Sequence, residues 1–123
     1  MEYKSDKPIY LQIVDYICNQ IVKNHWKENE RISSVRELSV SLGVNPNTIV
    51  RAFDNVEQHG IIYNKRGIGY FVSIAAKQKI LEIYKKEFFE ELLPDIFQKM
   101  KLYDIHIEEI NKAFSEQYSN RYD

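Results

Sequence analysis

Residues 32–73 read ISSVRELSVSLGVNPNTIVRAFDNVEQHGIIYNKRGIGYFVS, and this stretch decides the fold. Apolar residues at helical spacing predict two short helices on either side of the turn at 42–48. Residues 61–63 and 70–72 are β-formers and predict a two-stranded ribbon. Helix, turn, helix and ribbon in this order are typical of a winged helix-turn-helix, which places its second helix in the major groove of DNA.

The residues at the turn favour this interpretation. Gly43 follows the last apolar residue of the first helix, where a left-handed residue commonly ends a helix. Asn45 is expected to cap the second helix, with Pro46 at the first helical position, where its missing N–H is no loss. The apolar stripe predicted for the first helix consists of Val35, Leu38, Val40 and Leu42.

The second helix has two faces of different chemistry. Its predicted buried face consists of Ile49, Ala52, Phe53 and Val56, and its opposite face carries Asn47, Thr48, Val50, Arg51, Asp54 and Asn55. Asn reads adenine, and Arg reads guanine or binds phosphate, so Asn47, Thr48 and Arg51 are predicted to contact DNA. The alternative is that Thr48 bonds its own backbone and Asn47 is a polar first-turn residue.

The predicted ribbon has a basic tip. Lys65 and Arg66 place two positive charges there, and Gly67 and Gly69 allow the backbone to approach a polyanion closely. We expect these four residues to contact phosphate or the minor groove. The alternative is an ordinary hairpin turn, in which glycine and lysine are also common.

Three motifs together resemble the DNA-binding domain of the GntR family of bacterial transcription regulators. They are SVREL at 34–38, NPNTIVRAF at 45–53 and RGIGYFV at 66–72, and the second is similar to the family's short YtrA-like branch. The chain has Ile32-Ser33-Ser34 where the family usually has Leu-Pro-Ser. It also has Asn29 in place of the usual Gly, and since Asn tolerates left-handed backbone the turn is expected to survive.

The resemblance also implies a role for Arg36, which would contact the DNA backbone or a base edge. The alternative is a solvated arginine paired with Glu37 or Glu30. Outside the three motifs, the first helix is predicted from Pro8 to about His25, and a very short strand at 31–32 is expected to join the ribbon.

The predicted fold is mainly α with a small β wing. Residues 1–73 are predicted to form a winged helix-turn-helix DNA-binding domain, and residues 74–123 a C-terminal helical hairpin that serves as a dimerisation arm. A long helix is expected from about Ala75, with a kink at Pro94, and a last helix from about Ile107 to Tyr118. Two helices cannot enclose a small-molecule pocket and also bury their own apolar faces. The arm is therefore predicted to pair with a second copy, as the resemblance to the YtrA-like branch also implies. The predicted dimerisation residues are Leu81, Tyr84, Phe88, Leu92, Ile96, Ile110 and Phe114. The alternative is a hairpin that packs only on its own winged helix.

Composition narrows the function classes. The 123-residue chain has a net charge of −1, so a DNA-binding surface must be a local basic patch and its affinity salt-sensitive. Its single cysteine, Cys18, falls on an apolar helical stripe and fits a reducing, cytoplasmic compartment. No membrane span, metal-ligand spacing or catalytic arrangement is evident, so neither an enzyme nor a cofactor is predicted.

The predicted function is that of a homodimeric transcription regulator, expected to act as a repressor, that binds a pseudo-palindromic operator in double-stranded DNA. A second hypothesis is a winged-helix protein-interaction module without sequence-specific DNA binding, which the near-neutral charge favours. The sequence names neither the operator nor any small-molecule effector.

Overall fold

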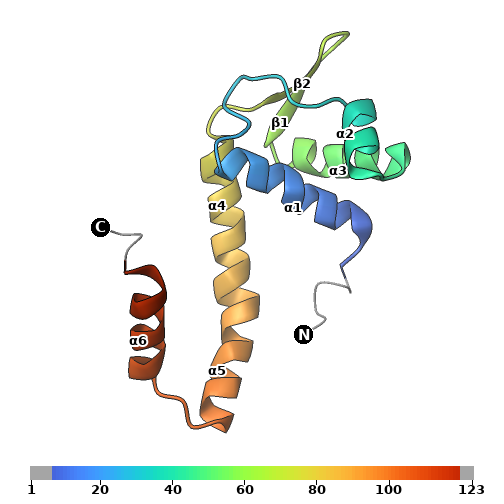
Figure 1. Cartoon of the computed structure of the whole chain (residues 1–123). Helices are drawn as coiled ribbons and strands as arrows, with labels where there is room; N and C mark the ends of the chain where they lie inside the picture. The colour runs from blue at the N-terminus through green and yellow to red at the C-terminus, as the bar shows by residue number, and fades with distance from the viewer. Residues whose placement is uncertain (1–6, 120–123) are drawn as a thin grey trace. The chain divides into compact units, whose positions relative to one another are not determined.

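The computed structural model describes residues 7–119 and separates the chain into two compact units that divide between Ile83 and Tyr84. Among the described residues, the first unit contains three helices, a two-stranded sheet and the start of a fourth helix (Figure 1). These elements are α1 (Ile9–Val22), α2 (Val35–Leu42), α3 (Pro46–Gln58), β1 (Ile62–Lys65), β2 (Gly69–Val72) and α4 (Ala76–Glu87). The predicted fold, mainly α with a small β wing, is confirmed.

The first unit has a continuous apolar core to which every one of these elements contributes. Helix α3 is central, since it packs against α1, α2 and β1. Its predicted inner face is fully buried, and it consists of Ile49, Ala52, Phe53 and Val56. Ala76 and Ile80 of α4 are buried as well. The start of α4 is therefore part of the first unit.

The stripe predicted for the first helix of the motif is wrong at one position. Leu38 is buried, and Val35 and Leu42 are half-buried, but 78% of the Val40 side chain is exposed. Successive residues of an α-helix turn by about 100°, so a residue two places from Leu38 lies on nearly the opposite face. Only the three residues spaced by three and four share the buried face.

Helix α1 is shorter than predicted, ending at Val22 rather than near His25. Asn24 adopts a left-handed conformation, with φ of 65°. The amide of His25 then donates to the carbonyl of Gln20 at 2.9 Å, a bond that satisfies a carbonyl at the helix end. The prediction extended the helix past Val22, but the left-handed backbone at Asn24 does not allow the helix to continue.

The helix-turn-helix forms as its local residues predicted. Gly43 has φ of 65° at the end of α2. The side chain of Asn45 accepts a hydrogen bond from the amide of Asn47 at 2.8 Å, and Pro46 is the first residue of α3. The helix therefore begins at a fixed residue.

The wing is an antiparallel ribbon in which Lys65 pairs with Gly69 across the tip. Where a very short strand was expected at 31–32, a single isolated bridge joins Arg31 to Phe71 of the ribbon. Asn29 is left-handed, with φ of 62°, so this residue supports the turn where the related family usually has glycine.

The described part of the second unit is helical. After the end of α4 come a π-helical turn at Phe88–Leu92, α5 (Leu93–Leu102) and α6 (Ile107–Tyr118). The amide of Leu93 bonds the carbonyl of Phe88, so the irregularity expected at Pro94 takes the form of this π-turn just before it. None of the residues described from 84 to 119 is buried.

Candidate nucleic-acid interface

Helix α3 presents one fully buried face and one face open to solvent. On the open face, Asn47 and Arg51 are exposed, Thr48 is half-buried and 42% of Val50 is exposed. Because α1, α2 and β1 hold the opposite face, this outer face is presented on a rigid support. The structure therefore leaves the predicted recognition side chains available for contact.

The outer face of α3 borders a small hollow. Its volume is about 330 Å³, and it is lined by Pro8, Ile9, Tyr10, Asn47, Thr48 and Arg51. The guanidinium carbon of Arg51 lies 3.9 Å from the centroid of the Tyr10 ring, a cation–π contact between α3 and the first turn of α1. Tyr10 is a residue that sequence reasoning did not place at the site, because the contact depends on how α1 crosses α3.

Arg36 lies in the first turn of α2 and is exposed. The start of this helix is held by a capping box. The Ser34 amide donates to the Glu37 carboxylate at 2.9 Å, and the Glu37 amide donates to Ser34 Oγ at 3.0 Å. The hydrogen bond from the Ser34 backbone, then that involving the Ser34 side chain, and the charge of Arg31 lower the pKa of Glu37. The box fixes the backbone that carries Arg36.

The wing tip carries the predicted basic residues in exposed positions. Lys65 and Arg66 are both exposed, and the Lys65 Nζ lies 4.6 Å from the centroid of the Phe71 ring. Gly67 has φ of 78°, a left-handed conformation that suits glycine at the tight tip. Two cations therefore extend from a ribbon that is tied to the core by its other end.

Arg31 joins this group, although the sequence did not single it out. It is exposed, and a Cβ added to Gly69 would lie only 2.8 Å from its Nε. Gly69, with φ of 146°, therefore leaves room for the Arg31 side chain against the wing. The signal was the short strand expected at 31–32, which implied that Arg31 lies beside the ribbon.

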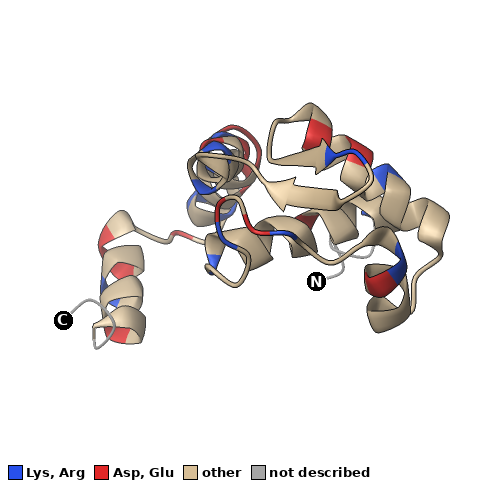
Figure 2. Ribbon diagram, turned by 90° about the horizontal axis from the view of Figure 1, so that it is seen from above, with Lys and Arg blue, Asp and Glu red and all other residues tan. Residues whose placement is uncertain are grey.

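Basic and acidic residues alternate along the chain rather than forming one basic segment. Figure 2 shows Lys and Arg interspersed with Asp and Glu along the ribbon diagram, in keeping with the net charge of −1. Contact with a polyanion then depends on the few cations of α2, α3 and the wing.

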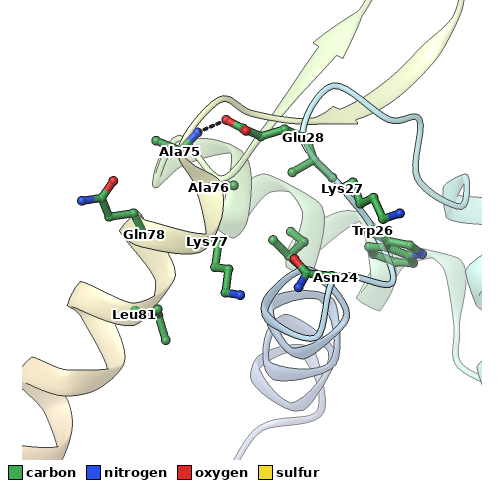
Figure 3. Close-up of a pocket in the computed structure, with 11 residues that line it drawn as sticks. Asn24, Trp26, Lys27, Glu28, Ala75, Ala76, Lys77, Gln78 and Leu81 are labelled. Atoms are coloured by element: carbon green, nitrogen blue, oxygen red, sulfur yellow. Dashed lines mark hydrogen bonds between the residues drawn. The ribbon is translucent and has the colours of Figure 1, made fainter.

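A larger cleft of about 500 Å³ lies in the first unit, between the end of α1, the 24–28 loop and the start of α4 (Figure 3). The labelled side chains around it include Asn24, Trp26, Lys77 and Leu81. At its edge, the amide of Ala75 donates to the Glu28 carboxylate at 2.6 Å. In the described part of the chain, no buried side-chain polar atom lacks a hydrogen-bond partner.

Most of the predicted dimerisation residues are exposed apolar side chains, with Leu81 in the first unit and the others in the second. Six of the seven are exposed, and Tyr84 is half-buried; the six are Leu81, Phe88, Leu92, Ile96, Ile110 and Phe114. Phe89, Phe97 and Ile107 are more than half exposed as well. Such large apolar surfaces mark sites of association.

Residues 7–119 contain neither a metal-binding cluster nor a membrane-spanning helix. No three His, Cys, Asp or Glu side chains lie close enough together to hold a metal ion. The helices described are also too short or too polar to cross a bilayer.

Known proteins are similar to this chain in sequence across the winged helix. Residues 9–72 match the family described as bacterial regulatory proteins, gntR family. The chain is 38% identical over 100 residues to the uncharacterized HTH-type transcriptional regulator YhcF of Bacillus subtilis, a similarity that covers 81% of each chain. It is 37% identical over 79 residues to the HTH-type transcriptional repressor YtrA of the same organism, which covers 64% of this chain and 61% of YtrA.

Solved structures show the same relationship. A putative transcriptional regulator of the GntR family from Bacteroides thetaiotaomicron superposes with a TM-score of 0.78 at 38% identity, covering 93% of this chain and 99% of its own. AraR(DBD), in complex with operator ORR3, superposes with a TM-score of 0.52 at 29% identity, covering 54% of this chain and 80% of its own. The family consists of regulatory proteins rather than enzymes. The chain belongs to the GntR family of bacterial regulatory proteins and is a DNA-binding transcription regulator of that family.

Proposed function

We propose that the protein is a repressor that binds a pseudo-palindromic operator as a homodimer. The observation that carries this proposal is the outer face of α3, where Asn47, Thr48 and Arg51 lie together above a fully buried inner face. The basic wing lies in the same compact unit. A helix with one rigidly held face and one exposed polar face suits insertion into a major groove.

The roles of the side chains follow from their hydrogen-bonding groups. Arg51 and Arg36 carry planar guanidinium groups that can bond guanine O6 and N7, or a phosphate, with two parallel hydrogen bonds. Asn47 can donate to and accept from adenine in the same paired manner. Lys65, Arg66 and Arg31 supply charge that binds phosphate and so positions the helix without reading sequence.

The wing glycines serve this contact through their backbone. Gly67 forms the tight tip between the two cations and the second strand, and Gly69 leaves space for Arg31. Neither residue adds a side chain between the backbone and a phosphate. The tip can therefore approach the duplex closely.

The homodimer is supported by the apolar surface of the second unit. No residue described from 84 to 119 is buried, yet this segment contains exposed Phe, Leu and Ile side chains along α5, α6 and the π-turn. Exposed apolar side chains of this kind are typically buried by association. A second copy of the same surface would bury them in a two-fold symmetric dimer. A two-fold dimer in turn matches a pseudo-palindrome, with half-sites about one helical turn apart.

Repression is supported by the name of a relative. YtrA, with which the chain shares 37% identity over 79 residues, is a transcriptional repressor. The same kind of action is proposed for this protein.

Selection of bound duplexes from a random-sequence pool tests the proposal. Several rounds at moderate salt should enrich an inverted repeat, and fluorescence anisotropy should then show that affinity falls steeply with salt but stays higher for the repeat than for unrelated DNA. Enrichment of a single, non-repeated site would contradict the dimer. Failure to enrich any sequence, with a folded sample, would instead favour the protein-interaction hypothesis.

A promoter fusion tests the direction of control. Placing the selected operator over the start of a reporter gene should lower reporter expression when the protein is produced. Increased expression from the same fusion would identify an activator.

A further inference from the structure

We propose that Tyr10 is a positioning residue for DNA recognition, because its ring holds the Arg51 guanidinium in place for contact with the operator. The inference rests on the proposed function, in which Arg51 contacts DNA. It assigns α1 a role in recognition beyond its packing against α3.

The geometry joins two helices at one side chain. The Arg51 guanidinium carbon lies 3.9 Å from the centroid of the Tyr10 ring, well within the distance of a cation–π contact. Tyr10 is half-buried, whereas Arg51 is exposed. The ring is thus partly enclosed by its surroundings, and the exposed arginine rests on it.

Asn47 and Thr48 lie beside the Tyr10–Arg51 contact. Both line the same hollow of about 330 Å³ with Tyr10 and Arg51. They precede Arg51 by four and three residues, which places all three side chains on one face of α3. The Tyr10 ring therefore forms one wall of the recognition patch.

Stacking on the ring has a consequence for affinity. A long arginine side chain that samples many rotamers must become ordered when it binds, and this ordering lowers affinity. The flat guanidinium can stack on an aromatic ring and still direct its N–H groups outward in its own plane, parallel to the ring. Arg51 held in this way loses less freedom on binding and meets the base pair in a defined orientation.

The phenol hydroxyl provides a way to separate two roles for Tyr10. If the ring positions Arg51, phenylalanine should serve as well as tyrosine. If the hydroxyl itself bonds a phosphate, Tyr10→Phe should weaken binding to all sequences and leave base preference unchanged.

The experiment measures operator affinity for the full chain carrying Tyr10→Leu, Tyr10→Phe, Arg51→Ala or the pair Tyr10→Leu and Arg51→Ala. Tyr10→Leu should weaken binding to the selected operator by about three- to tenfold, the range expected when one long side chain loses its ordering. It should also reduce discrimination at the same base pair that Arg51→Ala affects. Tyr10→Phe should bind as the unchanged protein does. With Arg51 already replaced, Tyr10→Leu should have no further effect.

Tyr16→Leu is the matched control. Tyr16 also lies on α1 and is half-buried, but its ring packs edge-on against Trp26, with 6.2 Å between centroids. Its replacement should leave base preference intact. Unfolding curves and light scattering on every variant separate loss of fold or dimer from loss of positioning.

Three outcomes would overturn the inference. One is weakened binding with unchanged base preference in Tyr10→Leu, another is weakened binding in Tyr10→Phe, and the third is full additivity of Tyr10→Leu and Arg51→Ala. The proposed function fails separately, if the unchanged protein enriches no operator. Normal operator binding by Arg51→Ala would leave the proposed function standing but would remove Arg51 from the site, and the inference with it.

Discussion

The two units of the molecule bury their apolar residues to very different degrees. The first unit buries side chains from each of its helices and from both strands, with Phe53 and Ile49 fully enclosed. The described part of the second unit buries none, although it is rich in aromatic and aliphatic side chains. A unit with its own core can hold recognition side chains in fixed positions, whereas one without a core depends on association to cover its surface. DNA contact and dimerisation are therefore expected to respond differently to mutation.

Phe53→Ala should have the largest effect, because it removes the largest fully buried side chain of the first unit. Truncating a buried phenylalanine typically costs about 3–5 kcal/mol, through lost burial and the cavity left behind. Urea unfolding monitored by circular dichroism measures this change.

Val40→Ala is the control for that change. The side chain is 78% exposed, so its truncation should alter the free energy of unfolding by less than about 0.5 kcal/mol. A cost for Val40→Ala similar to that for Phe53→Ala would show that the core of the first unit is not as described.

Leu92→Asp should weaken association through the second unit without unfolding the first. Leu92 is 46% exposed in one chain, so a carboxylate there should do little to a monomer. In a dimer that covers it, an unpaired charge should weaken association by roughly a hundredfold or more, equivalent to about 3 kcal/mol. Light scattering over a dilution series measures the dimer, and anisotropy the operator affinity.

Glu90→Gln, a nearby exposed change, should leave both quantities unaltered. A dimer of undiminished stability in Leu92→Asp would mean that the interface lies elsewhere. Unfolding of the winged helix in this variant would contradict the independence of the two units.

The sequence predicted those parts of the molecule whose causes are local. Gly43, Asn45 and Pro46 determine the turn through their own backbone preferences, so the helix-turn-helix was correctly placed. The last helix was placed correctly because its apolar residues repeat at regular spacing between clear ends. The error at Val40 came from grouping apolar residues without regard to their angle around the helix.

The contacts around the candidate site depend on tertiary packing and could not be predicted in this way. Arg51 meets Tyr10 because α1 crosses α3, and no spacing in the sequence encodes this pair. Arg31 lies against Gly69 because residue 31 bridges to the wing, which the short strand expected at 31–32 implied only in outline. The π-turn before Pro94 was also missed, because a helix that lacks one hydrogen bond can adapt in several ways.

Lys65→Ala and Arg51→Ala, both in the first unit, should weaken DNA binding in different ways. Lys65→Ala, at a phosphate contact, should weaken binding about equally for all sequences and lower the slope of log affinity against log salt by about 1. Arg51→Ala, at a base contact, should cost about 1–3 kcal/mol and relax preference at one base pair. Competition assays against operator variants at several salt concentrations measure both. Identical profiles for the two variants would show that α3 and the wing do not have distinct roles.

Removing the Glu37 charge from the capping box of α2 should have the smallest effect on the free energy of unfolding. This effect should depend on pH. The bonds from Ser34 and the charge of Arg31 lower the pKa of Glu37 in the folded chain below its ordinary value of 4.5. The carboxylate therefore adds stability that is present above pH 4.5 and is lost as the pH falls through the lower folded pKa. Glu37→Gln keeps an acceptor for the Ser34 amide but has no charge, so it should unfold more readily than the unchanged protein at pH 7 and equally at low pH. Urea titrations from pH 7 to pH 3 measure the difference, and a gap that persists in acid would place the effect outside the carboxylate. Because the box supports only the first turn of α2, its loss should leave the second unit and its association unchanged.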